Sequence, residues 1–250
     1  MTEELERIAA DLHTHTALSP CAERSATPPA IVEAALERGL GLIAVTDHNT
    51  AGNAAAVVRC GEIAGLKVLP GIEVTTREEA HVVCLFDDVE SALKLEDAIS
   101  AASPAIPNDA SLFGRQVLMN DLGEETGEIE RMLLMASDIS VERLAELARE
   151  LGGLVVAAHI DRSANSVVSN LGFIPESARF DALEITANTT KEEAAERFPG
   201  AERYPLIRSS DAHAPEQVGD AFTLFLLARP TTAEIRSALR GECGREYLVE

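Results

Sequence analysis

Short apolar runs rich in β-branched residues recur along the chain and predict the strands of one sheet. The predicted strands cover residues 8–12, 42–46, 67–74, 81–86, 154–158, 182–186, 206–209 and 222–228. Helical stretches separate several of them. Thr27 can cap a helix that opens with Pro28 and Pro29 and ends at Gly39, and residues 140–152 form a second helix with the same kind of boundaries.

Strand, helix and strand in repetition predict parallel strands joined by right-handed crossovers. Seven or so such strands in one domain predict a barrel or a doubly wound sheet. We expect an α/β fold of the first kind, a (β/α) barrel that occupies residues 1–250 as a single domain.

Two segments interrupt this rhythm. Residues 87–138 contain a helix over 89–100, a stretch rich in proline and asparagine, and a predicted hairpin in which 116–120 pairs with 130–135. We interpret this segment as an insertion that covers the mouth of the barrel. Residues 160–179 follow a strand and are predicted to form a long functional loop.

The charge of the chain narrows the range of partners. Forty-two acidic residues against 21 basic ones leave a net charge of −21, which repels duplex phosphate and makes general nucleic-acid or anionic-membrane binding unfavourable. The first residues lack the basic region of a signal peptide, and no apolar run approaches the ~20 residues that span a bilayer. We therefore expect a cytoplasmic protein that acts without a membrane.

The candidate chemistry lies in the histidines. All six lie next to predicted strands, and five of them lie at or just beyond a C-terminal strand end: His13, His15, His48, His159 and His213. His81 instead opens its strand. A lone histidine near a strand is usually a packing or surface residue, but six in this position predict a shared site.

Spacing groups these residues further. In an extended strand every second side chain shares a face, so Asp11, His13 and His15 are expected to project together, as are Asp211 and His213. Glu73 ends an otherwise apolar strand, where a carboxylate must be paired or bound to metal. Asp47 and His48 are neighbours and point to opposite faces. We assign His48 as a ligand and Asp47 as a residue that orients an imidazole or a water.

The motifs DLHTHT, VTDHN, PGIEVTT with HVV, AHIDR and SSDAH, in this order from residue 11 to 213, resemble the successive motifs of the PHP family, the polymerase and histidinol phosphatase domain. This resemblance implies a distorted seven-stranded (β/α) barrel with two or three divalent metals at the C-terminal strand ends. It implies that His13, His15 and Asp211 hold one metal, that His81 and His159 hold a second, and that Glu73 bridges them. It also implies that His48 and His213 hold a third.

One position departs from the family pattern. Relatives place an Asp-Gly pair just after the first motif, with the aspartate serving the third metal, whereas Pro20 and Cys21 stand here. Cys21 or Glu23 could compensate, and a buried neutral thiol at Cys21 is an open alternative.

Nitrogen and oxygen ligands suit Zn, Mn or Fe. Metals about 3.5–4 Å apart favour in-line attack of a metal-bound hydroxide on phosphorus, and they also suit amide hydrolysis. Arg162 matches the arginine of the family pattern A-H-P-x-R, although Ile160 replaces the proline, and a guanidinium there can clamp a phosphate. Arg208 lies three residues before Asp211 and is expected to face away from the metals.

These observations predict a metal-dependent phosphoesterase, a phosphatase or phosphodiesterase, that acts on a small phosphorylated metabolite or nucleotide, with Asp47, Arg162 and Asp211 serving catalysis. Three alternatives remain. An exonuclease of the PHP type that acts on nucleic-acid ends would be expected to carry a basic track. A non-catalytic metal-binding module would be expected to lack ligands. A metal-dependent amidohydrolase on a similar barrel differs only in its substrate.

Overall fold

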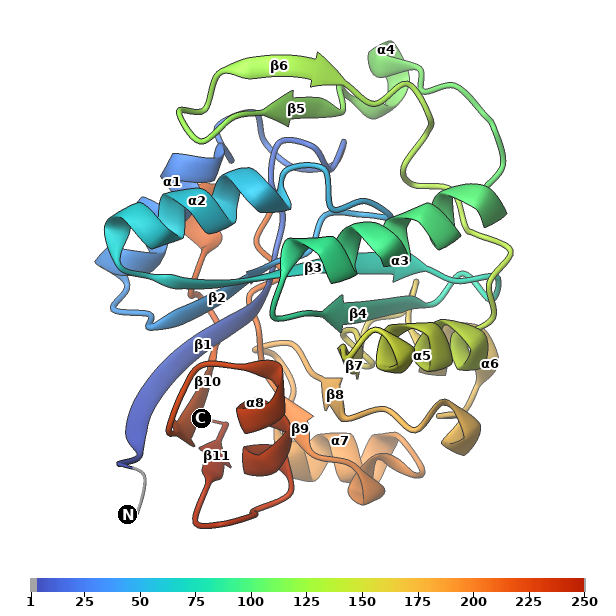
Figure 1. Ribbon diagram of the computed structural model, residues 1–250. Coiled ribbons are helices and arrows are strands. Elements are labelled where there is room, and N and C mark those ends of the chain that lie inside the picture. The colour runs from blue at the N-terminus through green and yellow to red at the C-terminus, as the bar shows by residue number, and fades with distance from the viewer. Residues whose placement is uncertain (1–3, 250) are drawn as a thin grey trace.

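The computed structural model describes residues 4–249, so residues 1–3 and 250 of the predicted domain lie outside the described part. One sheet of nine strands organises it, in the order β11-β10-β1-β2-β3-β4-β7-β8-β9 (Figure 1). The strands are β1 (Glu6–Thr14), β2 (Leu42–Val45), β3 (Lys67–Thr75), β4 (His81–Leu85), β7 (Leu154–Ala157), β8 (Ala182–Glu184), β9 (Leu206–Ile207), β10 (Thr223–Leu227) and β11 (Glu246–Leu248).

The predicted seven-stranded barrel is wrong in strand count and in strand direction. The sheet is a curled half-barrel, in which β4 runs antiparallel to β3 and β7, and β10 runs antiparallel to β1. A parallel connection needs about a dozen residues or more, and only residues 76–80 join β3 to β4. The curl brings the segment after β9 back to the first strand, where the His15 amide donates to the Ala212 carbonyl over 2.9 Å.

Two apolar layers fix the sheet. The outer layer packs against helices that include α1 (Pro28–Glu37), α2 (Ala54–Ala64), α3 (Val89–Ala102) and α5 (Val141–Glu150). The inner layer consists of the alternate strand residues, such as Leu12, Leu69 and Val156. Ile235 and Leu239 of α8 (Thr232–Leu239) pack into this inner layer. Helix α8 lies at the end of the sheet opposite the hairpin of β5 (Val117–Met119) and β6 (Glu125–Glu128) (Figure 1).

The predicted helix boundaries are confirmed where a cap marks them. The Thr27 side chain accepts a hydrogen bond from the Ala30 amide at the start of α1, and Ser140 accepts one from the Arg143 amide at the start of α5. The predicted loop 160–179 holds α6 (Val167–Leu171) and a 3₁₀ turn, η1 (Glu176–Ala178). Three further short helices are α7 (Lys191–Arg197), η2 (Ala201–Arg203) and η3 (Pro215–Gln217).

The segment 87–138 contains a hairpin, but its second strand differs from the prediction. The hairpin pairs β5 (Val117–Met119) with β6 (Glu125–Glu128), and α4 (Ala110–Phe113) precedes it. Residues 130–135 are instead held by Gln116, whose Nε2 donates to the Arg131 carbonyl and whose Oε1 accepts from the Leu133 amide. This irregular segment buries Met132 and Leu133. No helix within residues 4–249 is long and apolar enough to cross a membrane.

Candidate metal centre

The six histidines converge at one end of the sheet. His13 and His15 come from the end of β1, His48 follows β2, His159 follows β7, and His213 lies in the segment after β9. His81 opens β4. Because β4 is antiparallel to its neighbours, this start lies beside Thr75 at the end of β3, and the one exception in the sequence pattern meets the other five.

Glu73 is the centre of the cluster. Its carboxylate is buried, and five imidazole nitrogens lie 2.8–3.4 Å from its two oxygens. These nitrogens belong to His13, His15, His48, His81 and His159. A carboxylate surrounded in this way on both oxygens has the contacts expected of a bridging metal ligand.

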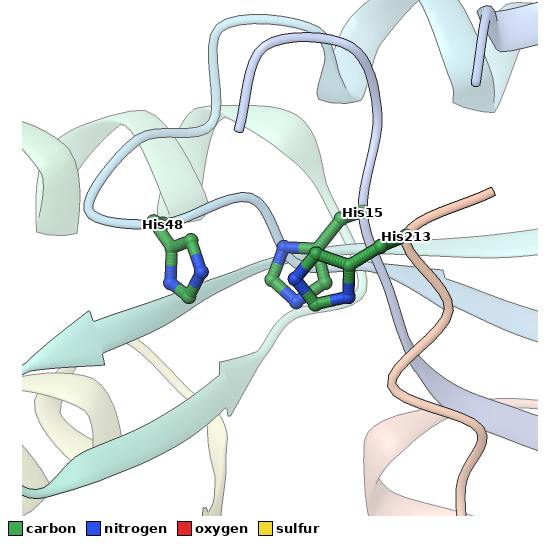
Figure 2. A group of neighbouring side chains, drawn as sticks. All are labelled: His15, His48 and His213. Carbon is green, nitrogen blue, oxygen red and sulfur yellow. The ribbon is translucent and has the colours of Figure 1, made fainter. Parts of the chain in front are cut away.

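Three groups of side chains in the described residues have ligand atoms close enough to share one ion. The first group is His13, His15, Glu73 and Asp211, the second is His48, Glu73 and His81, and the third is His15, His48 and His213. Figure 2 shows the third group, with the three imidazoles facing one another from three different loops. His159 contacts Glu73 at 3.1 Å but falls outside these three groups.

Several imidazole nitrogens and carboxylate oxygens of the cluster lie close together without forming hydrogen bonds, as atoms that bind a cation would. The Nε2 atoms of His13 and His15 lie 3.2 Å apart, an arrangement in which two neutral imidazoles can oppose their lone pairs. Glu73 Oε2 and His48 Nδ1 lie 2.9 Å apart, yet neither atom makes a hydrogen bond of acceptable geometry with the described residues. Buried polar atoms are almost always satisfied, so these atoms point to ions as their partners.

The pKa values of the histidines also support cations as partners of these atoms. Burial lowers the pKa of His15, but its hydrogen bond to Asp211 and the nearby charge of Glu73 outweigh burial and raise the pKa to about 9. Burial lowers the pKa of both His48 and His213 to about 4, which leaves them as the neutral imidazoles that metals bind. The carboxylates around His15 thus stabilise positive charge, which a divalent ion would also supply.

Two of the candidate ligands have unusual backbone geometry. His159 has φ 28° and Asp211 has φ 51°, both in the left-handed region. Such conformations cost on the order of 1–3 kcal/mol and cluster at functional sites. The strained turns direct both side chains back over the end of the sheet.

Glu184 is a site residue that the sequence prediction missed. Both oxygens of its buried carboxylate lie 3.1 Å from His13 Nδ1, and Oε1 also accepts a hydrogen bond from the His159 amide. A carboxylate on Nδ1 directs Nε2 toward the metals and raises its basicity. The signal was present, since Glu184 lies in the apolar run 182–186 as Glu73 lies in its own.

Hydrogen-bond contacts link Asp47 to His15 through Ser19. The buried Asp47 carboxylate accepts hydrogen bonds from the Ser19 hydroxyl at 2.7 Å and from the Thr16 amide at 2.8 Å. Ser19 Oγ lies 3.0 Å from His15 Nδ1. The expected role of Asp47 in orienting an imidazole is thus compatible with the structure, through a contact that the sequence did not specify.

Asp11 departs from its expected place. The structure turns its carboxylate away from the imidazoles, to the amides of Ser210 and Gly219 and the hydroxyl of Ser210, and the β1–β2 pairing is irregular between Asp11 and Thr14. This irregularity breaks the simple alternation on which the expectation depended. Burial raises the pKa of Asp11 to about 6.

Cys21 and Glu23, the two candidate ligands near the position that differs from the family pattern, lie in different surroundings. Cys21 lines the pocket above the imidazoles, whereas the exposed Glu23 does not and accepts a hydrogen bond from Ser25. Although Cys21 as a whole is exposed, its thiol sits in low-dielectric surroundings that, together with the charge of Glu73, raise its pKa to about 12.

Two pockets of about 470 Å³ each lie on either side of Arg162, and His159 and Asp211 line both of them. Arg162 Nη2 lies 2.6 Å from Asp211 Oδ2, and about half of the side chain is exposed. Arg208 lines neither pocket, and its guanidinium donates to the Thr189 carbonyl over 2.7 Å.

The end of the inserted segment forms a wall of the first pocket. Residues 134–136 line it, and the Asn49 side-chain amide, next to His48, donates to the carbonyls of Leu133 and Met135. The hairpin itself packs farther away, where Asn53 bonds the backbone of Val117 and Met119.

A curled α/β sheet with histidines and carboxylates gathered at one end of its strands is typical of metal-dependent hydrolases. The chain belongs to the PHP domain family, whose model matches residues 11–156, and a PHP-associated region matches residues 187–243. Members of this family are metal-dependent phosphoesterases and nucleases, and they bind several divalent ions.

Known relatives fall into two kinds. The chain is 37% identical over 93 residues to the 5'-3' exoribonuclease Rnm of Escherichia coli K12. This match covers 34% of this chain and 30% of that protein. It is 28% identical over 139 residues to the phosphoribosyl 1,2-cyclic phosphate 1,2-diphosphodiesterase of Eggerthella lenta. This second match covers 56% of this chain and 48% of that protein. The matches therefore span less than half the length of either relative.

A solved structure of similar fold is endonuclease Q in complex with a 27-mer duplex substrate with an abasic lesion at the active site. The TM-score is 0.72 at 20% identity, over 96% of this chain and 58% of that one. At this identity the likeness is one of fold.

Proposed function

We propose that the protein is a metal-dependent phosphoesterase that hydrolyses a small phosphorylated metabolite or nucleotide. The observation that carries this proposal is the Glu73 carboxylate between five imidazole nitrogens, beside a pocket with an exposed arginine. Bound divalent ions would supply Lewis acidity and activate water for attack on phosphorus.

The residues divide this work among them. His13, His15 and Asp211 would hold one ion, His81 and His159 a second, and Glu73 would bridge the two. The third ion would lie between His48 and His213, with His15 close to both. These ligands suit Zn, Mn or Fe.

Arg162 would bind the substrate phosphate. Its guanidinium lies between the two pockets and is half exposed, so it can turn from Asp211 to a phosphate oxygen. Asp47 and Glu184 would position the imidazoles of His15 and His13 without touching substrate.

The size of the first pocket and its wall at residues 134–136 favour a small substrate. Gln116 fixes the segment that leads into this wall. The net charge of −21 also weighs against a long polyanion.

Action on nucleic-acid ends is the second candidate, and the similarity to an exoribonuclease favours it. A panel of phosphomonoesters, nucleotides, cyclic phosphates and 5'-labelled oligonucleotides, assayed with added Mn or Zn, separates the two. We expect the highest kcat/KM on a small phosphate ester. Higher kcat/KM on oligonucleotide ends would favour the second candidate, and hydrolysis of amides alone would contradict both.

A further inference from the structure

A third pocket, which we call the basic pocket, lies at the end of the strands opposite the histidines. It has a volume of about 570 Å³, and Gly152, Asp181 and Pro205 in its wall lie one or two residues before the starts of β7, β8 and β9. These three strands are parallel, so their starts share one end of the sheet, whereas His159 and Glu184 lie at the opposite end. The pocket shares no lining residue with the two pockets beside the metal ligands.

The wall of this pocket is basic in a strongly acidic protein. Five of the 21 basic residues of the chain line it, against a single carboxylate, that of Asp181. The five are Arg149, Arg179, Arg203, Arg236 and Arg240. Like charges repel, so gathering guanidinium groups here costs free energy unless an anion compensates them.

The protein itself satisfies only some of these groups. Arg236 is held by Asp181 and the Gly153 carbonyl, and Arg149 donates to the carbonyls of Ala178 and Arg179. These hydrogen bonds hold both side chains in the pocket wall, and they leave Arg149 without a carboxylate partner among the described residues.

The remaining three arginines are exposed. Arg203 pairs with Glu176, while Arg240 comes no nearer than 3.9 Å to Glu242. The Arg179 side chain makes no hydrogen bond or ion pair with residues 4–249. Its backbone is left-handed, at φ 50°, in the turn that precedes Phe180.

We propose that this pocket binds a small phosphate-bearing anion. Guanidinium groups match phosphate oxygens in pairs, and the volume is that of a small-molecule site. A nucleic-acid strand fits less well, because Glu176, Glu202 and Glu242 contact the same arginines from the rim and would repel a long polyanion. The half-buried Tyr204 ring, packed edge-on against Phe180, adds an apolar wall.

Titration of inorganic pyrophosphate into the metal-loaded full-length protein, followed by calorimetry, tests this proposal. We expect two classes of site. Arg179→Gln and Arg240→Gln should each weaken one class about tenfold or more, since a charge-assisted hydrogen bond contributes about that factor. Arg162→Ala should weaken only the other class. Gln is shorter than Arg, but it removes the charge while keeping an unbranched polar side chain and the same backbone requirement at φ 50°.

Arg59→Gln is the matched control, because Arg59 is an exposed helical arginine paired with Glu62 far from this pocket along the chain. An equal loss in Arg59→Gln would attribute binding to overall charge and overturn the proposal. So would a single class of site that Arg179→Gln leaves unchanged. Tighter binding of a single-stranded oligonucleotide than of pyrophosphate, lost in the same two variants, would replace the small anion with a nucleic acid.

Discussion

The two ends of the same strands carry opposite kinds of structure. At the metal end, buried imidazoles and carboxylates face one another, and two of them require left-handed backbone. At the other end, Ile235 and Leu239 of α8 pack against the inner layer, and the arginines lie outside it. One end thus gathers buried polar groups at a cost in stability, whereas the other end combines apolar packing with an exposed basic surface.

Removing the central carboxylate should have the largest effect. In Glu73→Ala or His13→Ala we expect loss of bound metal together with a fall in activity of about 10³-fold or more, because several kcal/mol of transition-state stabilisation depends on the ions. Metal analysis and steady-state kinetics on the same preparations measure both. Glu192→Ala, at an exposed helical glutamate, is the control. Full activity in either variant would refute the assignment.

A cavity at the opposite end should change stability alone. Ile235 is fully buried, so Ile235→Ala should lower the free energy of unfolding by about 2–5 kcal/mol and leave the metal content of the folded protein unchanged. Urea unfolding and metal analysis check the two parts. Loss of metal from folded Ile235→Ala would break the separation between the two ends.

The two arginines near the C-terminal strand ends should differ. Arg162→Ala should lower kcat/KM for a phosphate ester without loss of metal. The lost transition-state stabilisation should be about 1.5–3 kcal/mol, the scale of a charge-assisted hydrogen bond. Arg208→Ala should instead reduce stability, because its guanidinium bonds the Thr189 carbonyl. If Arg208→Ala is the variant with impaired kinetics, the phosphate pocket lies elsewhere.

The positioning carboxylate should act on metal affinity. Glu184→Gln keeps the shape of the side chain but weakens the contact to His13 Nδ1, so we expect metal affinity to fall about 10–100-fold with the fold retained. Competition with a chromophoric chelator measures this affinity. Unchanged affinity would reduce Glu184 to a packing role.

The smallest effect is expected at Cys21. His15, His48 and His213 already offer three nitrogen atoms to the third ion, so Cys21→Ser should leave the titration of the third metal equivalent unchanged. Weaker binding of that equivalent in Cys21→Ser would instead make the thiol a ligand.

The sequence predicted most strands but not how they pair. Apolar runs identify β1 to β4 and β7 to β10 because burial on both faces leaves a strong local signal. The direction of β4 depends on the five-residue connection at 76–80, which is too short for a crossover. The curl of the sheet arises from contacts between distant segments, such as Thr14 with Ala212, and leaves no local signal.

The candidate site, like the fold, could be predicted from the sequence only in part. The histidines and Glu73 could be predicted because they stand in short motifs, and Glu184 could have been found by the same reasoning as Glu73. Ser19 between Asp47 and His15 could not, since a serine in a loop carries no specific signal. The five arginines of the basic pocket come from α5, the turn after η1, η2 and the end of α8, and these elements meet only in the fold.

Metal content of the wild-type protein, purified without chelator, tests the central claim most directly. The cluster around Glu73 predicts at least two divalent ions per chain and phosphate ester hydrolysis that disappears on chelation and returns with added Mn or Zn. Fewer than one ion per chain after incubation with these metals, or hydrolysis that survives their removal, would contradict it.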